Sequence, residues 1–145
     1  MSREVEQQNR RMLRARDAMD RQYADPLDIP ALARIAHVSE AHFIRTFRAT
    51  FGETPHRYLQ RRRVERAMAL LVSTDRSVTD ICMSVGFSSL GTFSRTFRDI
   101  VGESPKDYRA AHPVVARVPT HFSMAWTRPS DMSSSFGEGE RPGPQ

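Results

Sequence analysis

The stretch VGFSSLGTFSRTFRDIVGESPKDYR, residues 85–109, decides the fold because the chain holds a second version of it. Residues 29–58 read IPALARIAHVSEAHFIRTFRATFGETPHRY, and key positions in them recur at one constant offset of fifty. The recurring pairs are Phe43 and Phe93, Arg45 and Arg95, Phe47 and Phe97, Gly52 and Gly102, Pro55 and Pro105, and Tyr58 and Tyr108. A repeat of this period indicates duplicated supersecondary units. Two copies are too few for a solenoid, so we predict a duplicated module.

Both copies carry the same helix start and stop signals. Each has a short helix, a turn, a longer helix that a glycine ends, and a further helix that a proline begins. Ser77 with Asp80 resembles a capping box. The predicted N-caps are Ser39 and Thr54 in the first copy and Ser77, Ser88 and Ser104 in the second. Gly52 and Gly102 are predicted to end the longer helices, and Pro55 and Pro105 to begin the helices that follow.

The rest of the chain predicts helices around the two copies. An amphipathic helix is expected over about residues 5–23, and a second one begins near Asp28 and stops near His37. A connector helix follows over about residues 56–73. The predicted inward residues are Met12, Leu13, Ala15, Met19 and Tyr23 in the first helix, and Val64, Ala67, Met68 and Leu71 in the connector.

These elements predict an all-α fold of about seven helices. Two helix-turn-helix subdomains, about residues 5–54 and 77–111, are joined by a long connector helix over about residues 55–73. A rigid connector would hold the two modules at a fixed distance. Proline, serine and glycine become frequent after Ala111, so residues 112–145 are expected to form a disordered tail.

The composition favours a nucleic-acid partner. The 145-residue chain has a net charge of +5, and the tail after His112 holds three arginines and three carboxylates, so the excess lies before it. A basic folded part is typical of nucleic-acid binding. The single Cys82 allows no internal disulfide and fits a reducing cytoplasm. The chain shows no signal peptide and no apolar run of about 20 residues, so we expect a cytoplasmic protein without a membrane partner.

Outward arginines carry the chemistry of the long helices. With Phe43 at the centre of the buried face and about 100° per residue, Arg45 falls on the far side, and Arg95 does so relative to Phe93. Such a helix, after a tight turn and a supporting helix, is a helix-turn-helix arrangement that brings N-terminal residues to base edges in the major groove. Both arginines can form two hydrogen bonds to guanine O6 and N7.

At these residues the sequence resembles a known family. Residues 85–109 resemble the signature of AraC/XylS-type transcription regulators, and the similarity runs over about residues 14–111. The resemblance implies two helix-turn-helix units whose recognition helices enter successive major grooves on one face of the DNA. It implies a sequence-specific regulator of transcription that binds double-stranded DNA, with activation as the usual mode.

Two sets of positions are expected to contact DNA. The first set, implied by the resemblance, reads bases and comprises Ala41, His42, Ile44, Arg45, Leu90, Gly91, Thr92, Ser94 and Arg95. The second set contacts phosphate from the helix caps, the later turns of the long helices and the connector, and comprises Ser39, Arg48, Arg62, Arg66, Ser88 and Arg98.

The chain departs from the family's common pattern in two ways. Many members have polar side chains where Ala41, Ile44, Leu90 and Gly91 stand here, so we expect part of the specificity to come from thymine-methyl contacts and DNA shape. Most relatives also have a separate effector or dimerisation domain, for which this chain has no room. It therefore resembles the stand-alone, MarA-like type, expected to act as a monomer on an asymmetric site.

Other functions find less support in the residues. No glycine-rich phosphate loop or catalytic triad is recognisable, so we expect neither enzyme activity nor a cofactor. The histidines lack the spacing of a metal site. Arg61–Arg63 are interpreted as the solvated face of the connector, and Phe122 and Trp126 as uncommitted tail. The alternative is an all-helical interaction module that contacts RNA polymerase without reading DNA. In the preferred interpretation, double-stranded DNA and RNA polymerase are both partners.

Overall fold

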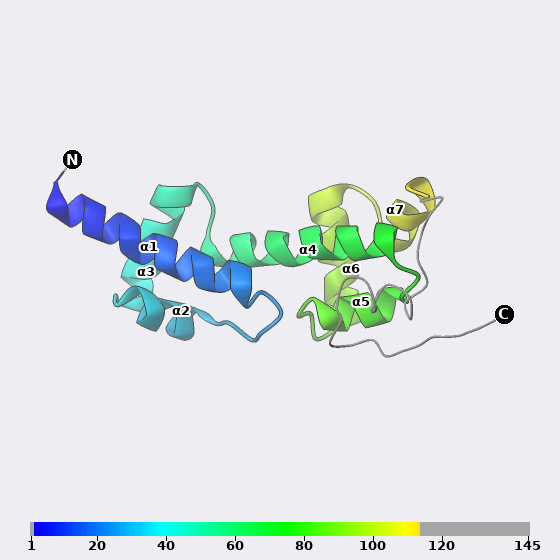
Figure 1. Ribbon diagram of the computed structural model, residues 1–145, viewed down its shortest axis with the longest axis horizontal. Coiled ribbons are helices and arrows are strands. Elements are labelled where there is room, and N and C mark those ends of the chain that lie inside the picture. The colour runs from blue at the N-terminus through cyan, green and yellow to red at the C-terminus, as the bar shows by residue number, and fades with distance from the viewer. Residues whose placement is uncertain (1, 114–145) are drawn as a thin grey trace, which may run out of the picture.

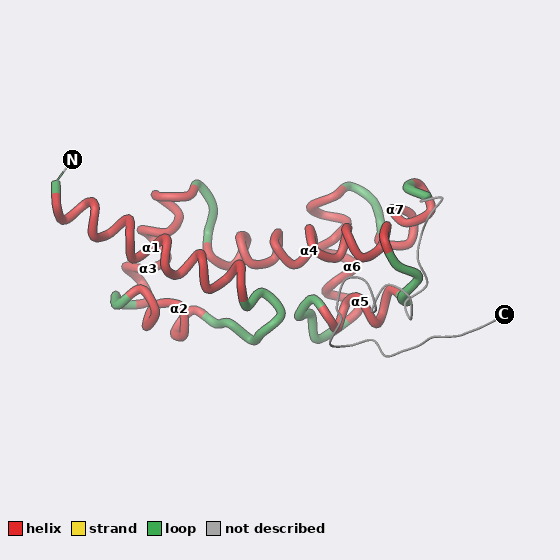
Figure 2. Tube along the Cα trace, in the orientation of Figure 1, coloured by secondary structure: helices red, strands yellow, loops and turns green. Residues whose placement is uncertain are grey.

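The computed structural model describes residues 2–113, and every regular element in that range is a helix (Figure 1, Figure 2). The helices are α1 (Arg3–Arg21), α2 (Ile29–Ala36), α3 (Glu40–Phe51), α4 (Pro55–Ser73), α5 (Val78–Ser84), α6 (Leu90–Val101) and α7 (Pro105–Ala111). The predicted all-α fold of about seven helices is confirmed for this part of the chain. The expected tail, with Phe122 and Trp126, lies outside the described residues from position 114 onward.

Two three-helix units are arranged along α4. Figure 1 shows α1, α2 and α3 around the N-terminal part of α4, and α5, α6 and α7 around its C-terminal part. In the same view α2 and α5 lie on one side of α4, and α3 and α6 both run from that side toward the opposite side. Both α3 and α6 have twelve residues and begin fifty positions apart. The duplication in the sequence is therefore a duplication of backbone.

Each unit has its own apolar core, and α4 contributes to both. Tyr58 and Leu59 complete the first core, whereas Val64, Ala67 and Leu71 belong to the second. The other buried members are Met12, Ala15, Met19, Leu32, Ala33, Ala36, Phe43 and Phe47 in the first core, and Ile81, Cys82, Val85, Phe87, Phe93 and Phe97 in the second. Each large buried side chain contributes about 1.5–3 kcal/mol of stability. Since the N-terminal part of α4 packs in the first core and its C-terminal part in the second, each end of α4 is held by a different unit.

The two cores repeat the same aromatic packing. In the first unit the ring centroids of Phe43 and Phe47 are 5.6 Å apart, and those of Phe47 and Tyr58 are 5.7 Å apart. In the second unit the corresponding rings, fifty positions later, are 5.7 Å apart in both pairs. Equivalent cores place the outward faces of α3 and α6 in equivalent positions within their units.

Every described helix begins at a side-chain cap. In each case the cap oxygen accepts a hydrogen bond from the backbone N–H three residues later, which is worth about 1 kcal/mol. The predicted left-handed stops, Gly52 with φ 80° and Gly102 with φ 100°, are confirmed. The caps are Ser2, Asp28, Ser39, Thr54, Ser77, Ser89 and Ser104.

The cap predicted at Ser88 is wrong by one residue. Ser89 Oγ accepts the N–H of Thr92 at 3.1 Å, and Ser89 O accepts the N–H of Phe93 at 3.1 Å. These bonds begin α6 at Leu90. Ser89 also lies fifty positions after Ser39, so the repeat itself contained the correct register.

The predicted first helix is displaced by two residues. It begins at Arg3 rather than near residue 5, because Ser2 Oγ accepts the N–H of Val5 at 3.1 Å. Leu13, predicted to face inward, is 40% exposed, and Ala18 is buried in its place. Met12, Ala15 and Met19 define the buried face at three- and four-residue steps, and Leu13 lies about 100° away from Met12.

Candidate nucleic-acid interface

The N-terminal half of α3 presents a row of side chains to solvent. Phe43 and Phe47 are fully buried, so the residues on the opposite side of the helix face outward. Ala41 and Arg45 are exposed, and Ile44 is 38% exposed despite its apolar side chain. Within residues 2–113, Arg45 forms no ion pair. Its guanidinium is available to an external acceptor.

The start of α6 presents an equivalent row with one difference. Leu90 is 41% exposed, and Gly91 and Arg95 are exposed. Arg95 Nη2 donates to Thr92 Oγ1 at 3.4 Å, and a Cβ built on Gly91 would lie 3.5 Å from Arg95 Nη1. Arg95 is thus folded back over the first turn of α6, whereas Arg45 has no such bond. An exposed bond of this length is weak, so Arg95 can turn outward at little cost.

The other predicted contact positions lie on or beside the same two helices. His42 and Ser94 are half-buried, and Arg48 and Arg98 are exposed further along α3 and α6. The exposed Ser39 and Ser88 lie just before the two helices. The nine positions predicted to read bases therefore fall into two groups, one in each unit, and all but His42 and Ser94 are exposed. This arrangement has the geometry of a double helix-turn-helix.

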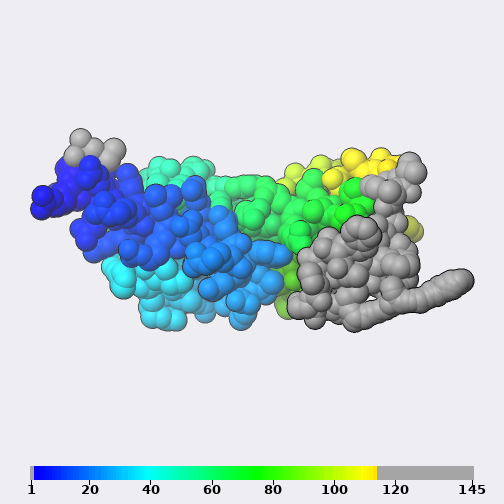
Figure 3. All heavy atoms as spheres, viewed as in Figure 1, coloured from blue at the N-terminus to red at the C-terminus, as the bar shows by residue number. Residues whose placement is uncertain are grey.

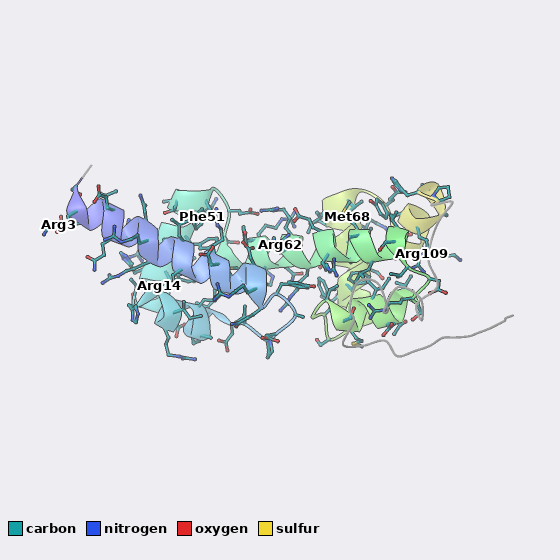
Figure 4. The ribbon with its side chains drawn as sticks, viewed as in Figure 1. Arg3, Arg14, Phe51, Arg62, Met68 and Arg109 are labelled. Atoms are coloured by element: carbon teal, nitrogen blue, oxygen red, sulfur yellow. The ribbon has the colours of Figure 1, made fainter. Side chains whose placement is uncertain are left out.

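The two connector arginines of the predicted phosphate set differ in their surroundings. Arg62 lies on α4 close to α1 (Figure 4), where its Nε donates to Asp20 at 3.1 Å and its Nη1 to Glu65 at 2.9 Å. The hydrogen bond to Glu65, together with the negative charge of Asp20 and the hydrogen bond to it, raises the pKa of Arg62. Arg66, one residue beyond Glu65, is exposed. Arg66 is therefore the connector arginine that reaches solvent without leaving an ion pair.

The interpretation of Arg61–Arg63 as a solvated face is wrong. All three side chains are half-buried, and each is bonded to a different element of the first unit. Arg61 Nη2 donates to Glu53 at 2.7 Å, Arg62 binds Asp20 of α1, and Arg63 donates to two backbone carbonyls after α1. The arginine run thus fastens the connector to the first unit. No periodicity in the sequence distinguishes such arginines from solvated ones.

A buried tyrosine strengthens the same attachment. Tyr58, 8% exposed, donates its hydroxyl hydrogen to Asp20 Oδ1 at 2.7 Å. Burial and the bond to the Asp20 carboxylate raise the pKa of Tyr58 to about 12. The same carboxylate oxygen accepts from Arg62, so Asp20 joins α1 to α4 through two donors. This network is structural, because it joins α1 to α4 and includes no residue of the exposed rows of α3 and α6.

The described residues form neither a metal-binding cluster nor a membrane-spanning helix. Among residues 2–113, no cluster of three or more His, Cys, Asp or Glu side chains has a geometry that could hold a metal ion. None of the helices that the structure describes combines the length and apolarity that a membrane span requires.

The duplicated turn with an exposed arginine on the second helix defines a class, the helix-turn-helix DNA-binding proteins. Residues 32–111 match a family model described as a helix-turn-helix domain. The chain belongs to this family, that of AraC-type transcription regulators, as the resemblance implied. It is a family of DNA-binding regulators and not of enzymes.

Solved structures share the arrangement. The chain is similar to the C-terminal domain of AraT, a response regulator from Geobacillus stearothermophilus, with a TM-score of 0.71 and 26% identity over 74% of this chain and 90% of that one. A probable AraC family transcriptional regulator from Rhodopseudomonas palustris gives a TM-score of 0.66 at 26% identity, over 72% and 99% of the two chains. The DNA-binding domain of AdpA, solved in complex with a target DNA, gives 0.64 at 33% identity, over 69% and 90%.

The curated relatives that the chain matches are longer than it. An uncharacterized HTH-type transcriptional regulator of Staphylococcus aureus is 32% identical over 99 residues, which is 68% of this chain and 13% of that protein. The probable transcriptional regulator LumQ of Photobacterium leiognathi is 30% identical over 83 residues, 57% of this chain and 34% of that protein. The chain thus spans a minor part of these relatives.

Proposed function

We propose that this chain is a sequence-specific regulator that reads two successive major grooves of one DNA duplex with α3 and α6. The observation that carries the proposal is the repeated exposure of Arg45 and Arg95, at the same register of two twelve-residue helices. A single outward arginine is an ordinary surface charge. The same residue in two equivalent units along one helix suits two equivalent grooves of a duplex.

Within this proposal the residues of the two exposed rows contact different base features. Arg45 and Arg95 bind guanine through two hydrogen bonds each, and the apolar Ile44 and Leu90 contact thymine methyl groups. The close approach of α6 to base edges is eased by Gly91, which has no side chain. The shorter polar residues His42, Thr92 and Ser94 add hydrogen bonds, and Ala41 adds apolar contact at the start of α3.

We propose that residues before and after the two base-reading groups contact phosphate. The exposed arginines Arg48 and Arg98 lie further along each recognition helix, and the exposed Ser39 and Ser88 lie before them. On the connector we propose Arg66, because Arg62 would first have to leave Asp20 and Glu65. Such contacts set orientation and affinity, while the base contacts set specificity.

The units form a direct repeat within one chain, which supports binding as a monomer to an asymmetric site. Two groove entries one helical turn apart would be separated by about 34 Å along the DNA. We propose activation through contact with RNA polymerase as the mode of action, in the cytoplasm of a bacterial cell. This part of the proposal rests on the family alone, whereas the DNA-reading part rests on α3 and α6.

Selection of binding sites from a random duplex pool tests the proposal. The expected result is an enriched asymmetric motif with two parts one helical turn apart. Size-exclusion chromatography with light scattering, with and without the selected duplex, checks that one chain binds one site. A pool that shows no enrichment, or a palindromic motif bound by a stable dimer, would contradict the proposal.

A further inference from the structure

The two cores meet on α4 at a short stretch that contains Arg63. The first core takes its last α4 residue from Leu59 and the second its first from Val64. Tyr23, in the loop after α1, packs against both cores. Among the seven helices that the structure describes, no pair with extensive contacts joins one unit to the other except through α4. The loop after α1 is therefore one place where the first unit contacts the second.

Arg63 holds this loop through backbone acceptors. Its Nε donates to Tyr23 O at 2.6 Å and its Nη2 donates to Asp25 O at 2.8 Å. Two bonds from one planar guanidinium fix the direction of the loop as well as its distance from α4. Among the described residues, Arg63 has no carboxylate partner.

The second unit packs against the same guanidinium. A Cβ built on Gly86 would lie 2.9 Å from Arg63 Nε and 3.0 Å from Ala24 Cα, and the Arg63 guanidinium lies 6.0 Å from the ring centroid of Phe87. Gly86 has φ 106°, whereas the corresponding turn of the first unit holds His37 at φ 60°. The turn of the second unit therefore requires glycine where it faces Arg63 and the loop.

In Figure 3 the blue atoms of α1 and its following loop abut green atoms of α4 near the middle of the molecule. We call the residues Tyr23, Ala24, Asp25, Arg63, Gly86 and Phe87 the joint.

The side chain of Arg63 is placed by hydrogen bonds rather than by complete packing. Arg63 borders a cavity of about 320 Å³ that Leu27, Ile29, Leu32 and Leu59 also line. Burial lowers the pKa of Arg63, so its charge is held in the joint at a cost in solvation. Without the two carbonyl bonds, the cavity would leave this side chain room to move away from Gly86.

We propose that Arg63 is a positioning residue that sets the distance and angle between the two recognition helices, and thereby the half-site spacing that the protein accepts. The inference rests on the proposed function, because it concerns how two reading units are aligned on one duplex. A change of one base pair in spacing moves a half-site by about 3.4 Å and turns it by about 34°, so a modest loosening of the joint alters which spacings fit.

The structure offers a matched control on the same helix. Arg57 Nη1 donates to Asp99 Oδ2 of α6 at 3.1 Å and also links the two units. The side chains of this pair are 46% and 71% exposed, so the pair contributes little. Arg57→Met removes one charge and one contact between the units without touching the joint.

The first measurement needs no DNA. Spin labels at Ala49→Cys on α3 and Ala110→Cys on α7, both exposed positions, report the distance between the units by pulsed electron paramagnetic resonance. We expect a narrow distance distribution for the labelled parent and for Arg57→Met, and a broad or displaced one for Arg63→Met. Arg63→Lys keeps the charge but has no planar fork, and it should give an intermediate width. Circular dichroism checks that each variant is helical, and Arg63→Lys serves alone if Arg63→Met does not fold.

The second measurement uses the selected site, an isolated half-site, and sites with one base pair added or removed between the halves. Because a looser link lowers the effective concentration of the second unit, Arg63→Met should lose about tenfold in affinity on the selected spacing and keep its half-site affinity. It should also discriminate less among the spacings than Arg57→Met does. A narrow distance distribution in Arg63→Met, or an unchanged spacing preference, would overturn the inference. A failure to select any site would instead contradict the proposed function, and the distance measurement would still decide the joint.

Discussion

Truncation of the two outward arginines, singly and together, tests the proposed reading surface most directly. Arg45 is exposed and forms no ion pair in the described part of the chain, so Arg45→Ala removes no internal bond. If Arg45 binds guanine through two hydrogen bonds, its loss should cost about 1–3 kcal/mol of specific binding, or about 5- to 150-fold in Kd. Arg95 must first give up its 3.4 Å bond to Thr92, so Arg95→Ala should fall toward the lower end of the range.

The matched control is Arg3→Ala. Arg3 is exposed at the far end of α1 (Figure 4), and its truncation removes the same unit of charge. Fluorescence anisotropy on the selected duplex should show at most a small loss for this variant. Urea denaturation should place the free energy of unfolding of all three variants within about 0.5 kcal/mol of the parent, because the side chains are at the surface.

Sequence preference gives the stricter comparison. Repeating the selection with Arg45→Ala should relax one or two adjacent positions of the motif and leave the rest unchanged, and Arg95→Ala should relax positions in the other half. Equal losses of DNA affinity for Arg3→Ala and Arg45→Ala, with an unchanged selected motif, would show that the arginines supply only charge. That result would refute the assignment of α3 and α6 as the helices that read the bases.

Two further predictions concern stability. Tyr58→Phe removes the 2.7 Å bond to Asp20 and should lower the free energy of unfolding by about 1.5–3 kcal/mol in urea denaturation. Burial and Asp20 raise the pKa of Tyr58 from 10.0 to about 12, so the folded state holds the phenol proton more tightly than the unfolded state does. The stability that this shift contributes is complete below pH 10 and is lost between pH 10 and 12. Tyr58→Phe should therefore remove this part of the loss of stability at alkaline pH. Gly52→Ala should cost only the strain of a left-handed residue, about 1–2 kcal/mol, because no heavy atom lies within 4 Å of its Cβ. Gly86→Ala adds a clash with Arg63 and Ala24 and should lower Tm further; equal losses in Tm would contradict the close approach at the joint.

Local signals in the sequence were sufficient for the helices and for most of their ends. Caps are decided by one side chain and a backbone group three residues away, so Ser39, Thr54 and Ser104 could be predicted from position alone. Where two serines stand together, local signals do not distinguish Ser88 from Ser89, and the fifty-residue repeat of Ser39 identifies Ser89 as the cap. The exposure of Arg45 and Arg95 followed from helical periodicity, since Phe43 and Phe93 fix the buried side.

The joint could not be predicted in this way. Arg61, Arg62 and Arg63 are identical in type and adjacent in sequence, yet each is bonded to a different element of the first unit. Those partners are 8 to 42 positions away, and two of them are backbone carbonyls that have no sequence signature. Contacts of this kind depend on how the units pack, which periodicity within one helix does not describe.

The sharing of α4 between two cores restricts how proteins with this architecture can diverge. One residue inserted between Leu59 and Val64 would rotate the second unit by about 100° about the helix axis and shift it by about 1.5 Å, so α6 would no longer face the same side as α3. Seven inserted residues would restore the phase to within about 20° but separate the units by about 10 Å. Under the proposed function, gradual change in half-site spacing through connector length is therefore closed to such a chain, and new target sequences would arise through substitutions on the surfaces of α3 and α6.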